Sequence, residues 1–87
     1  MAKKLTLLEQ MRRNPRADWS IDDIGKLCAE HHIDLMPPSR GDHFKAASPL
    51  IQGHLTIPAK RPVKPVYIRQ LVAMIDMHIM LTKLGSK

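Results

Sequence analysis

An apolar stripe near the end of this chain constrains its fold more than any other feature. From residue 65 to about residue 83, large apolar side chains recur every three or four positions, which is the spacing of one face of a helix. The stripe consists of Ile68, Leu71, Val72, Ile75 and Ile79. Pro65 suits the first turn of this helix, and Gly85 and Ser86 end it, so we expect the last few residues to be frayed. Because such a face must be buried against another layer, the rest of the chain has to supply one.

Short segments in the middle of the chain have the composition and alternation of β-strands. The strands are expected over residues 33–36, 42–48 and 54–57. Turns containing proline and glycine separate them, and Pro58 ends the third strand or places it at a sheet edge. In the second segment Phe44 and Ala46 share one face, whereas His43 and Lys45 share the other. We therefore expect one wet face and one face that packs on the helices.

Two helix-start signals precede the strands. Thr6 and Glu9 have the spacing of a capping box, which predicts a short helix that ends near Asn14. One face of that helix should carry Leu5, Leu8 and Met11. Ser20, followed by two acidic residues, predicts a second helix that runs to about His32. The order α-α-β-β-β-α predicts one α+β domain over residues 1–87, with the helices on one face of a three-stranded sheet.

The charge of the chain points to a polyanionic partner. It has 14 lysines and arginines against 8 acidic residues, a formal net charge of +6. In a small domain this favours nucleic acid or an acidic protein over a basic surface that serves only solubility. The three aromatic residues, Trp19, Phe44 and Tyr67, are too few for a stacking platform. We therefore expect a nucleic acid to be bound through its phosphates rather than recognised through unstacked bases.

Cysteine content and hydropathy predict a cytoplasmic protein. Cys28 is the single cysteine, so no intrachain disulfide forms, and its apolar helical position suits a core residue in a reducing compartment. No apolar run approaches the length of a membrane span, and the run at residues 5–8 is too short for a signal peptide. We expect no contact with membranes.

His43 is the candidate catalytic residue. It follows the flexible Gly41 and should lie on the wet face of its strand. Histidine can take up and release a proton near neutral pH, and Arg40 and Lys45 are placed to hold a phosphate beside it. Spacing alone slightly favours the alternative, a solvated histidine without a role.

Basic residues form two further groups. One consists of Lys60, Arg61, Lys64 and Arg69, around the start of the last helix. Cations at a helix N-terminus suit an anion, but a solvated charge run explains this group equally well. The other group consists of Arg12, Arg13 and Arg16, for which a solvated charge run is the better interpretation.

Metal binding is not expected. Cys28 and His32 have the spacing of a chelating pair on a helix, but no second well-spaced pair supports them. His78, beside the apolar stripe, is interpreted as a half-buried structural residue. We expect neither a metal nor a cofactor.

Three stretches of the chain together resemble the HicA toxins. "RGDHFKA" (40–46) is similar to the Gly-Ser-His motif of that family. "HLTIPAKRPVKPVYIRQLVAMI" (54–75) resembles its strand, basic linker and last helix, and "NPRADWSIDDIGKLCAEHHI" (14–33) resembles the helix before its first strand. The likeness covers residues 5 to about 76. Its most specific part is the Thr-Ile-Pro strand followed by the Lys-Pro start of a helix.

The resemblance implies a fold, an activity and a partner. The fold is like the double-stranded-RNA-binding domain, an α-β-β-β-α core with a three-stranded antiparallel sheet, here with an extra short N-terminal helix. The activity is that of a bacterial type II toxin, a metal-independent mRNA interferase that cleaves mRNA with a single catalytic histidine. The partner is a HicB-type antitoxin that masks the site in a hetero-oligomer.

The family motif also assigns residues. Its histidine maps onto His43 and its glycine onto Gly41, whereas Asp42 stands where the family usually has serine. A carboxylate there would favour the charged imidazole and repel a phosphate, so Asp42 tunes His43, orients it or weakens it. The expected RNA-binding residues are Arg40, Gly41, Lys45, Lys60, Arg61 and Lys64. The alternatives are a non-catalytic RNA-binding module of the same fold and a domain that binds an acidic protein.

Overall fold

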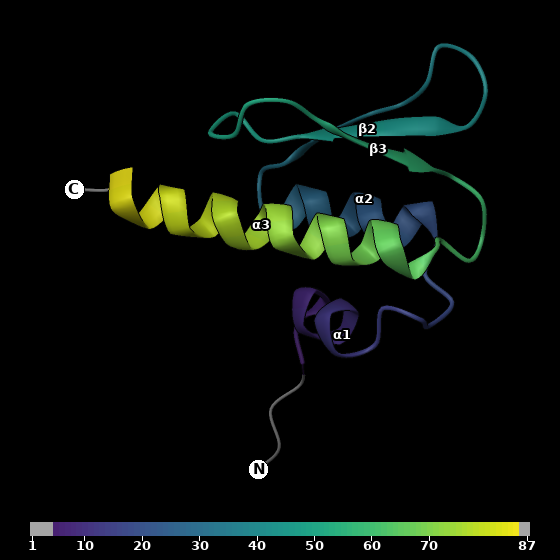
Figure 1. Ribbon diagram of the computed structural model, residues 1–87, viewed down its shortest axis with the longest axis horizontal. Helices are drawn as coiled ribbons and strands as arrows, with labels where there is room; N and C mark the ends of the chain where they lie inside the picture. Colours follow the sequence, from purple (N-terminus) through teal and green to yellow (C-terminus); the bar gives the residue numbers. More distant parts are fainter. Residues whose placement is uncertain (1–4, 86–87) are drawn as a thin grey trace.

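The computed structural model describes residues 5–85. Its elements are α1 (Leu7–Arg13), α2 (Ile21–Glu30), β1 (Asp34–Met36), β2 (His43–Ala47), β3 (Leu55–Pro58) and α3 (Pro65–Gly85). This is the predicted α+β order (Figure 1). The expected fraying of the C-terminus falls partly on residues 86–87, which lie outside the described residues.

Side-chain caps start the first two helices, as the sequence predicts. The Glu9 N–H donates to Thr6 Oγ1 at 3.2 Å, and Ser20 and Asp23 form a complete reciprocal capping box. α2 ends at Glu30, close to the predicted end near His32, and His32 has a φ of 58°, in the left-handed region. Leu5, which was predicted to share a helix face with Leu8 and Met11, precedes α1 and is exposed, whereas Leu8 and Met11 are buried.

The three strands form one antiparallel sheet in the order β1-β2-β3. In the register of β2 with β3, His43 lies opposite Pro58 and Phe44 lies opposite Ile57. Ala46 and Ile57 have no exposed surface, whereas His43 and Lys45 are exposed. The sheet therefore has the predicted inner and outer faces, and a slip of one residue would invert them.

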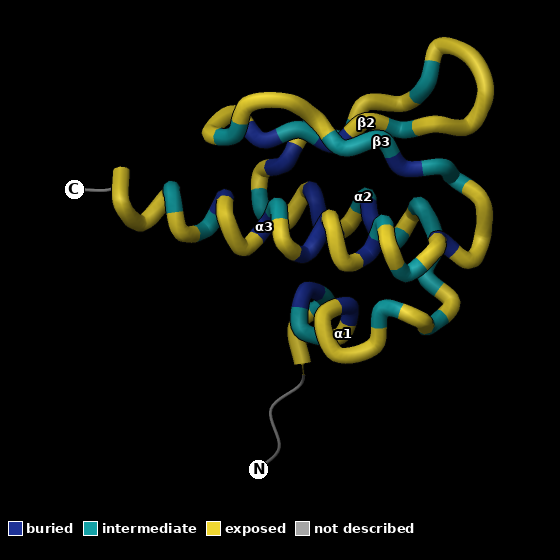
Figure 2. Tube along the Cα trace, in the orientation of Figure 1, coloured by how far each residue is buried: buried dark blue, intermediate teal, exposed yellow. Residues whose placement is uncertain are grey.

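All three helices lie on the inner side of the sheet. Figure 1 shows α2 and α3 beneath the strands, with α1 beyond them on the side away from the sheet. The predicted stripe of α3 faces the core, with Ile79 partly buried and its other four residues buried, and Figure 2 shows buried segments gathered where the layers meet. One cluster unites them, with the fully buried side chains of Met11, Ile24, Leu27, Ile57, Ile68, Leu71 and Ile75 at its centre. Each such side chain contributes roughly 1.5–3 kcal/mol of burial.

His78 is buried rather than half-buried, and it has a polar partner. Its Nδ1 lies 2.6 Å from Ser48 Oγ, and the Leu50 N–H donates to the same oxygen at 3.0 Å. Since Ser48 accepts from Leu50, its own hydroxyl proton is available to Nδ1. This pair ties the β2–β3 connection to α3.

Among the described helices, even the 21-residue α3 lacks an apolar run that is able to cross a bilayer.

Candidate functional site

His43 is the first residue of β2 and projects from the outer face of the sheet. Gly41 precedes it with a φ of +74°, which a residue with a Cβ rarely adopts. The Asp42 carbonyl then accepts a hydrogen bond from the Ala59 N–H at 2.7 Å. The turn is thereby tied to the far end of β3, and the backbone at His43 is held by its pairing with Pro58.

A hollow of about 400 Å³ lies beside this imidazole. Its walls come from the β1–β2 connection and the start of β2, and it is lined by Met36, Pro37, Pro38, Ser39, Arg40, His43 and Lys45. Three of the predicted site residues, Arg40, His43 and Lys45, therefore converge on one open space. A phosphate in this hollow would meet two cations and one proton-transfer group.

Asp42 lies against His43 on the side of the ring that carries Nδ1. Its Oδ1 is 3.3 Å from Nδ1, and both side chains are 61% exposed. An exposed pair of this kind contributes at most about 1 kcal/mol to stability. Within that limit, a carboxylate near Nδ1 favours the tautomer with the proton there, which leaves Nε2 as the acceptor.

A second basic hollow, of about 360 Å³, lies at the start of α3. It is lined by Pro58, Lys60, Arg61, Pro62, Lys64 and Tyr67. The structure thus brings together three of the predicted RNA-binding residues, Lys60, Arg61 and Lys64. Arg69 does not join them, because it borders a different hollow beside Arg12.

The connection that forms this second hollow is anchored to the α1–α2 connection. Val63 is buried, and its N–H donates to the Trp19 carbonyl at 2.8 Å. Arg61 Nε donates to Asp18 Oδ1 at 3.0 Å. This hydrogen bond, with the charge of Asp18, raises the pKa of the Arg61 guanidinium. Asp18 also balances part of the Arg61 charge, so Lys60 and Lys64 are the freer cations for a phosphate.

Pro58 places the wall of the second hollow beside His43 in the sheet. It is the partner of His43 in the β2–β3 ladder, and it also lines the hollow at the start of α3. Sequence reasoning missed Pro58 and Tyr67 as site residues. The one available signal was the position of Tyr67 in the first turn after the basic linker.

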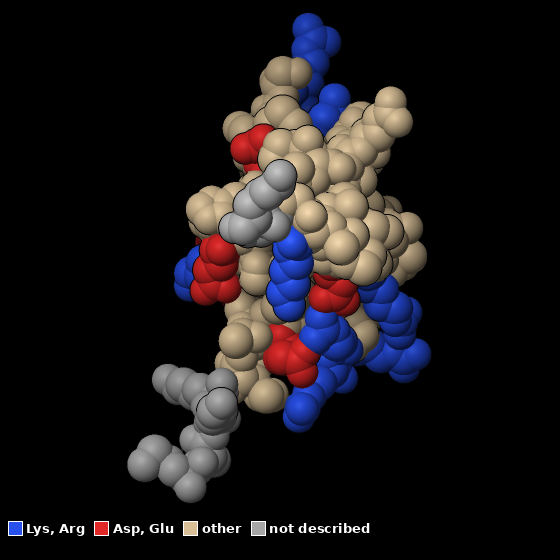
Figure 3. Space-filling view, turned by 90° about the vertical axis from the view of Figure 1, so that its left-hand side faces the viewer, with Lys and Arg blue, Asp and Glu red and all other residues tan. Residues whose placement is uncertain are grey.

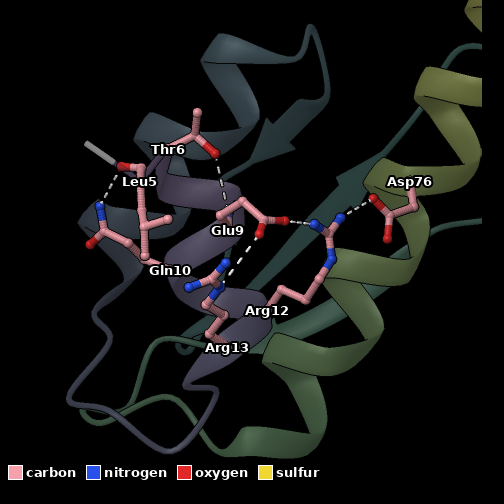
Figure 4. Close-up of polar contacts among 7 residues, drawn as sticks. All are labelled: Leu5, Thr6, Glu9, Gln10, Arg12, Arg13 and Asp76. Atoms are coloured by element: carbon pink, nitrogen blue, oxygen red, sulfur yellow. Dashed lines mark hydrogen bonds and ion pairs between the residues drawn. The ribbon is translucent and has the colours of Figure 1, made fainter. Parts of the chain in front are cut away.

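The arginines of α1 do not form an anion site. Figure 4 shows Arg12 between Glu9 and Asp76, in contact with both, so that it links α1 to α3. Arg13 Nε lies 3.6 Å from Glu9 Oε2. Figure 3 shows acidic and basic side chains interspersed over the lower part of the molecule, where α1 lies. Arg12 is thus more than a solvated charge, since it joins two helices.

Cys28 is a core residue, as predicted. Only 1% of it is exposed, and burial raises the pKa of its thiol to about 11.

Within residues 5–85, no three side chains of His, Cys, Asp or Glu come together in the arrangement of a metal site. Comparison of the chain with protein-family models, with curated proteins and with solved structures found no match.

Proposed function

We propose that this protein is a ribonuclease of the HicA type, in which His43 transfers the proton during cleavage of RNA. One observation carries the proposal: Arg40, His43 and Lys45 line the same open hollow on the outer face of the sheet. A proton-transfer group near two cations can assist attack on a phosphodiester, because it moves the proton while the cations offset the developing charge. The motif "RGDHFKA" and the α-β-β-β-α order, which we interpret as a core like the double-stranded-RNA-binding domain, support it.

In the proposed reaction the RNA supplies its own nucleophile. Nε2 of His43 takes the proton of a ribose 2′-OH, whose oxygen forms a bond to the neighbouring phosphorus. The bond from phosphorus to the 5′-oxygen breaks, and that oxygen receives a proton from the imidazolium or from water. The products are a 2′,3′-cyclic phosphate and a 5′-hydroxyl. Proton transfer of this kind contributes roughly 10²–10⁴-fold, which suits a slow enzyme.

Asp42 acts in this scheme as a positioning residue. Its carboxylate, 3.3 Å from Nδ1, would favour the tautomer with the proton on that nitrogen, in which Nε2 is free for the 2′-OH. The same negative charge opposes the RNA phosphate. We infer that Asp42, in place of the family's Ser, lowers the affinity for RNA and improves the orientation of the His43 imidazole.

The cations around the two hollows would hold the RNA backbone. Lys60, Arg61 and Lys64 come from one linker, and Arg40 and Lys45 flank the imidazole. A-form RNA is recognised mainly through phosphates and 2′-hydroxyl groups. A HicB-type antitoxin is the proposed partner, and it would cover the outer face of the sheet and bury His43. We place the protein in the cytoplasm, where its mRNA substrate is.

Product analysis tests the reaction. RNA is incubated with the protein in EDTA, and the 3′-ends of the fragments are identified by mass. We expect 2′,3′-cyclic phosphates, and no cleavage at a position where the ribose is replaced by 2′-deoxyribose. Loss of activity in EDTA would point to a metal, and cleavage of the deoxy position would contradict attack by the 2′-OH.

A non-catalytic RNA-binding module is the second candidate. The position of Asp42 beside the proposed phosphate site favours it, because a negative charge there opposes the substrate. This candidate predicts RNA binding without fragments, and equal RNA affinity for the wild type and His43→Ala.

A further inference from the structure

We propose that the hollow at the start of α3 holds the base of one unpaired nucleotide next to the cleaved phosphate, with Tyr67 as the stacking surface. That this nucleotide belongs to an RNA strand rests on the proposed function. The position and chemistry of the hollow do not, because they come from the six residues that line it.

The walls of this hollow suit a flat apolar group rather than a phosphate alone. Pro58, Pro62 and the ring of Tyr67 give it apolar surface, and its volume of about 360 Å³ falls within the range of small-molecule sites. Tyr67 is partly buried and packs against the core, so its ring is held in place before a ligand arrives. Every nucleobase offers a flat face to such a ring.

The rim of the hollow supplies the charge that a nucleotide needs. Lys60 and Lys64 are exposed there. The Lys64 carbonyl accepts from the N–H groups of Tyr67 and Ile68, so Lys64 caps the 21-residue α3. The first turn of α3 contains no acidic residue, unlike those of α1 and α2. The positive end of the helix dipole therefore adds to the lysine charges.

The β2–β3 ladder relates His43 to the wall of the Tyr67 hollow. Pro58, on the wall of the Tyr67 hollow, lies directly opposite His43. A strand of RNA whose phosphate contacts His43 would thus bring a neighbouring base to Tyr67. The other two aromatic residues are committed elsewhere, because Phe44 lies on the inner face of the sheet and Trp19 Nε1 donates to the Asn14 carbonyl. The protein therefore holds one base, and phosphate contacts still supply most of the affinity.

Binding to RNA that cannot be cleaved tests this inference separately from catalysis. The probe is a short, fluorescently labelled, single-stranded 2′-O-methyl oligonucleotide, in which the 2′-oxygen is blocked. Its control is an abasic oligonucleotide with the same number of phosphates. The variants are Tyr67→Phe, which keeps the ring, and Tyr67→Leu, which keeps apolar packing without the ring. Circular dichroism confirms that each variant is folded.

We expect Tyr67→Phe to bind the oligonucleotide as the wild type does, and Tyr67→Leu to bind about 5- to 100-fold more weakly. The abasic control should bind the wild type and Tyr67→Leu equally. Equal binding of the base-containing probe by folded Tyr67→Leu and the wild type would overturn the inference, as would its failure to bind the wild type. Loss of binding in Tyr67→Leu, in a protein that cleaves no RNA, would refute the proposed ribonuclease and keep the base site.

Discussion

His43 lies directly opposite Pro58, and through that one rung the proposed catalytic imidazole adjoins the basic hollow at the start of α3. The two halves of the site come from segments that are separated in sequence by β2 and β3. One is the turn at Gly41 and the other is the linker from Lys60 to Lys64. The hydrogen bond from the Ala59 N–H to the Asp42 carbonyl holds them in register.

The role of Asp42 predicts opposite effects on binding and on rate. Asp42→Asn removes the charge but keeps an acceptor beside Nδ1, so RNA should bind about three- to fivefold more tightly. Asp42→Ala removes the acceptor as well, and its kcat should fall about fivefold below that of Asp42→Asn. Binding is measured by anisotropy and kcat under saturating RNA. Weaker RNA binding by Asp42→Asn, or equal kcat values for the two variants, would contradict the positioning role.

The lysines of the hollow at α3 should each contact one phosphate. Lys64→Ala should therefore reduce the slope of log affinity against log salt concentration by about 0.7, the value for a single-stranded contact. Lys83→Ala is the matched control, because Lys83 lies in the last turn of the same helix, roughly 28 Å away. A change of slope in Lys83→Ala as large as that in Lys64→Ala would mean that only net charge matters.

The buried Ser48–His78 pair predicts a stability effect. Ser48→Ala leaves both Nδ1 of His78 and the Leu50 N–H without their partner, which should cost about 1–3 kcal/mol in the free energy of unfolding by urea. Replacing both residues, as Ser48→Ala with His78→Leu, should recover part of this loss, because the imidazole no longer needs a partner. Strictly additive losses in a double-mutant cycle would argue that the two side chains do not interact.

Cys28 predicts a loss of stability at alkaline pH. Its pKa is about 11 in the folded protein against an ordinary value of 9.0, so the folded state holds the proton more tightly. The corresponding stabilisation is complete below about pH 9 and is lost as the pH rises through 11, up to about 3 kcal/mol. Urea unfolding at a series of pH values should show a steeper decline for the wild type than for Cys28→Ala. Parallel declines would exclude the thiol as the cause.

Local signals explain which parts of the fold were predictable. The caps at Thr6 and Ser20, the alternation around Phe44 and the apolar stripe of α3 depend on neighbours within a few positions, and the structure has all of them. The end of α2 was predicted only approximately, because no glycine marks the left-handed residue at His32. In the site, the shared face of His43 and Lys45 followed from strand alternation, and the position of Arg40 followed from the turn that precedes β2.

Long-range pairs were beyond the reach of the sequence. Ser48 and His78 are 30 positions apart, and Asp18 and Arg61 are 43 apart. Neither pair belongs to a periodic pattern, so only the packing of the layers brings its members together. The same holds for Tyr67, whose wall partner Pro58 belongs to another element. A count of aromatic residues limits how many bases a protein can stack, but it does not predict that Tyr67 is the one that lines a hollow.

The rate of RNA cleavage by His43→Ala tests the central proposal most directly. His54→Ala is the matched control, because His54 is also exposed but lies beside the opposite end of the β2–β3 ladder. With EDTA present, His43→Ala should cleave RNA roughly 10²–10⁴-fold more slowly than the wild type, and His54→Ala should cleave at the wild-type rate. Cleavage by folded His43→Ala at the wild-type rate would contradict the account.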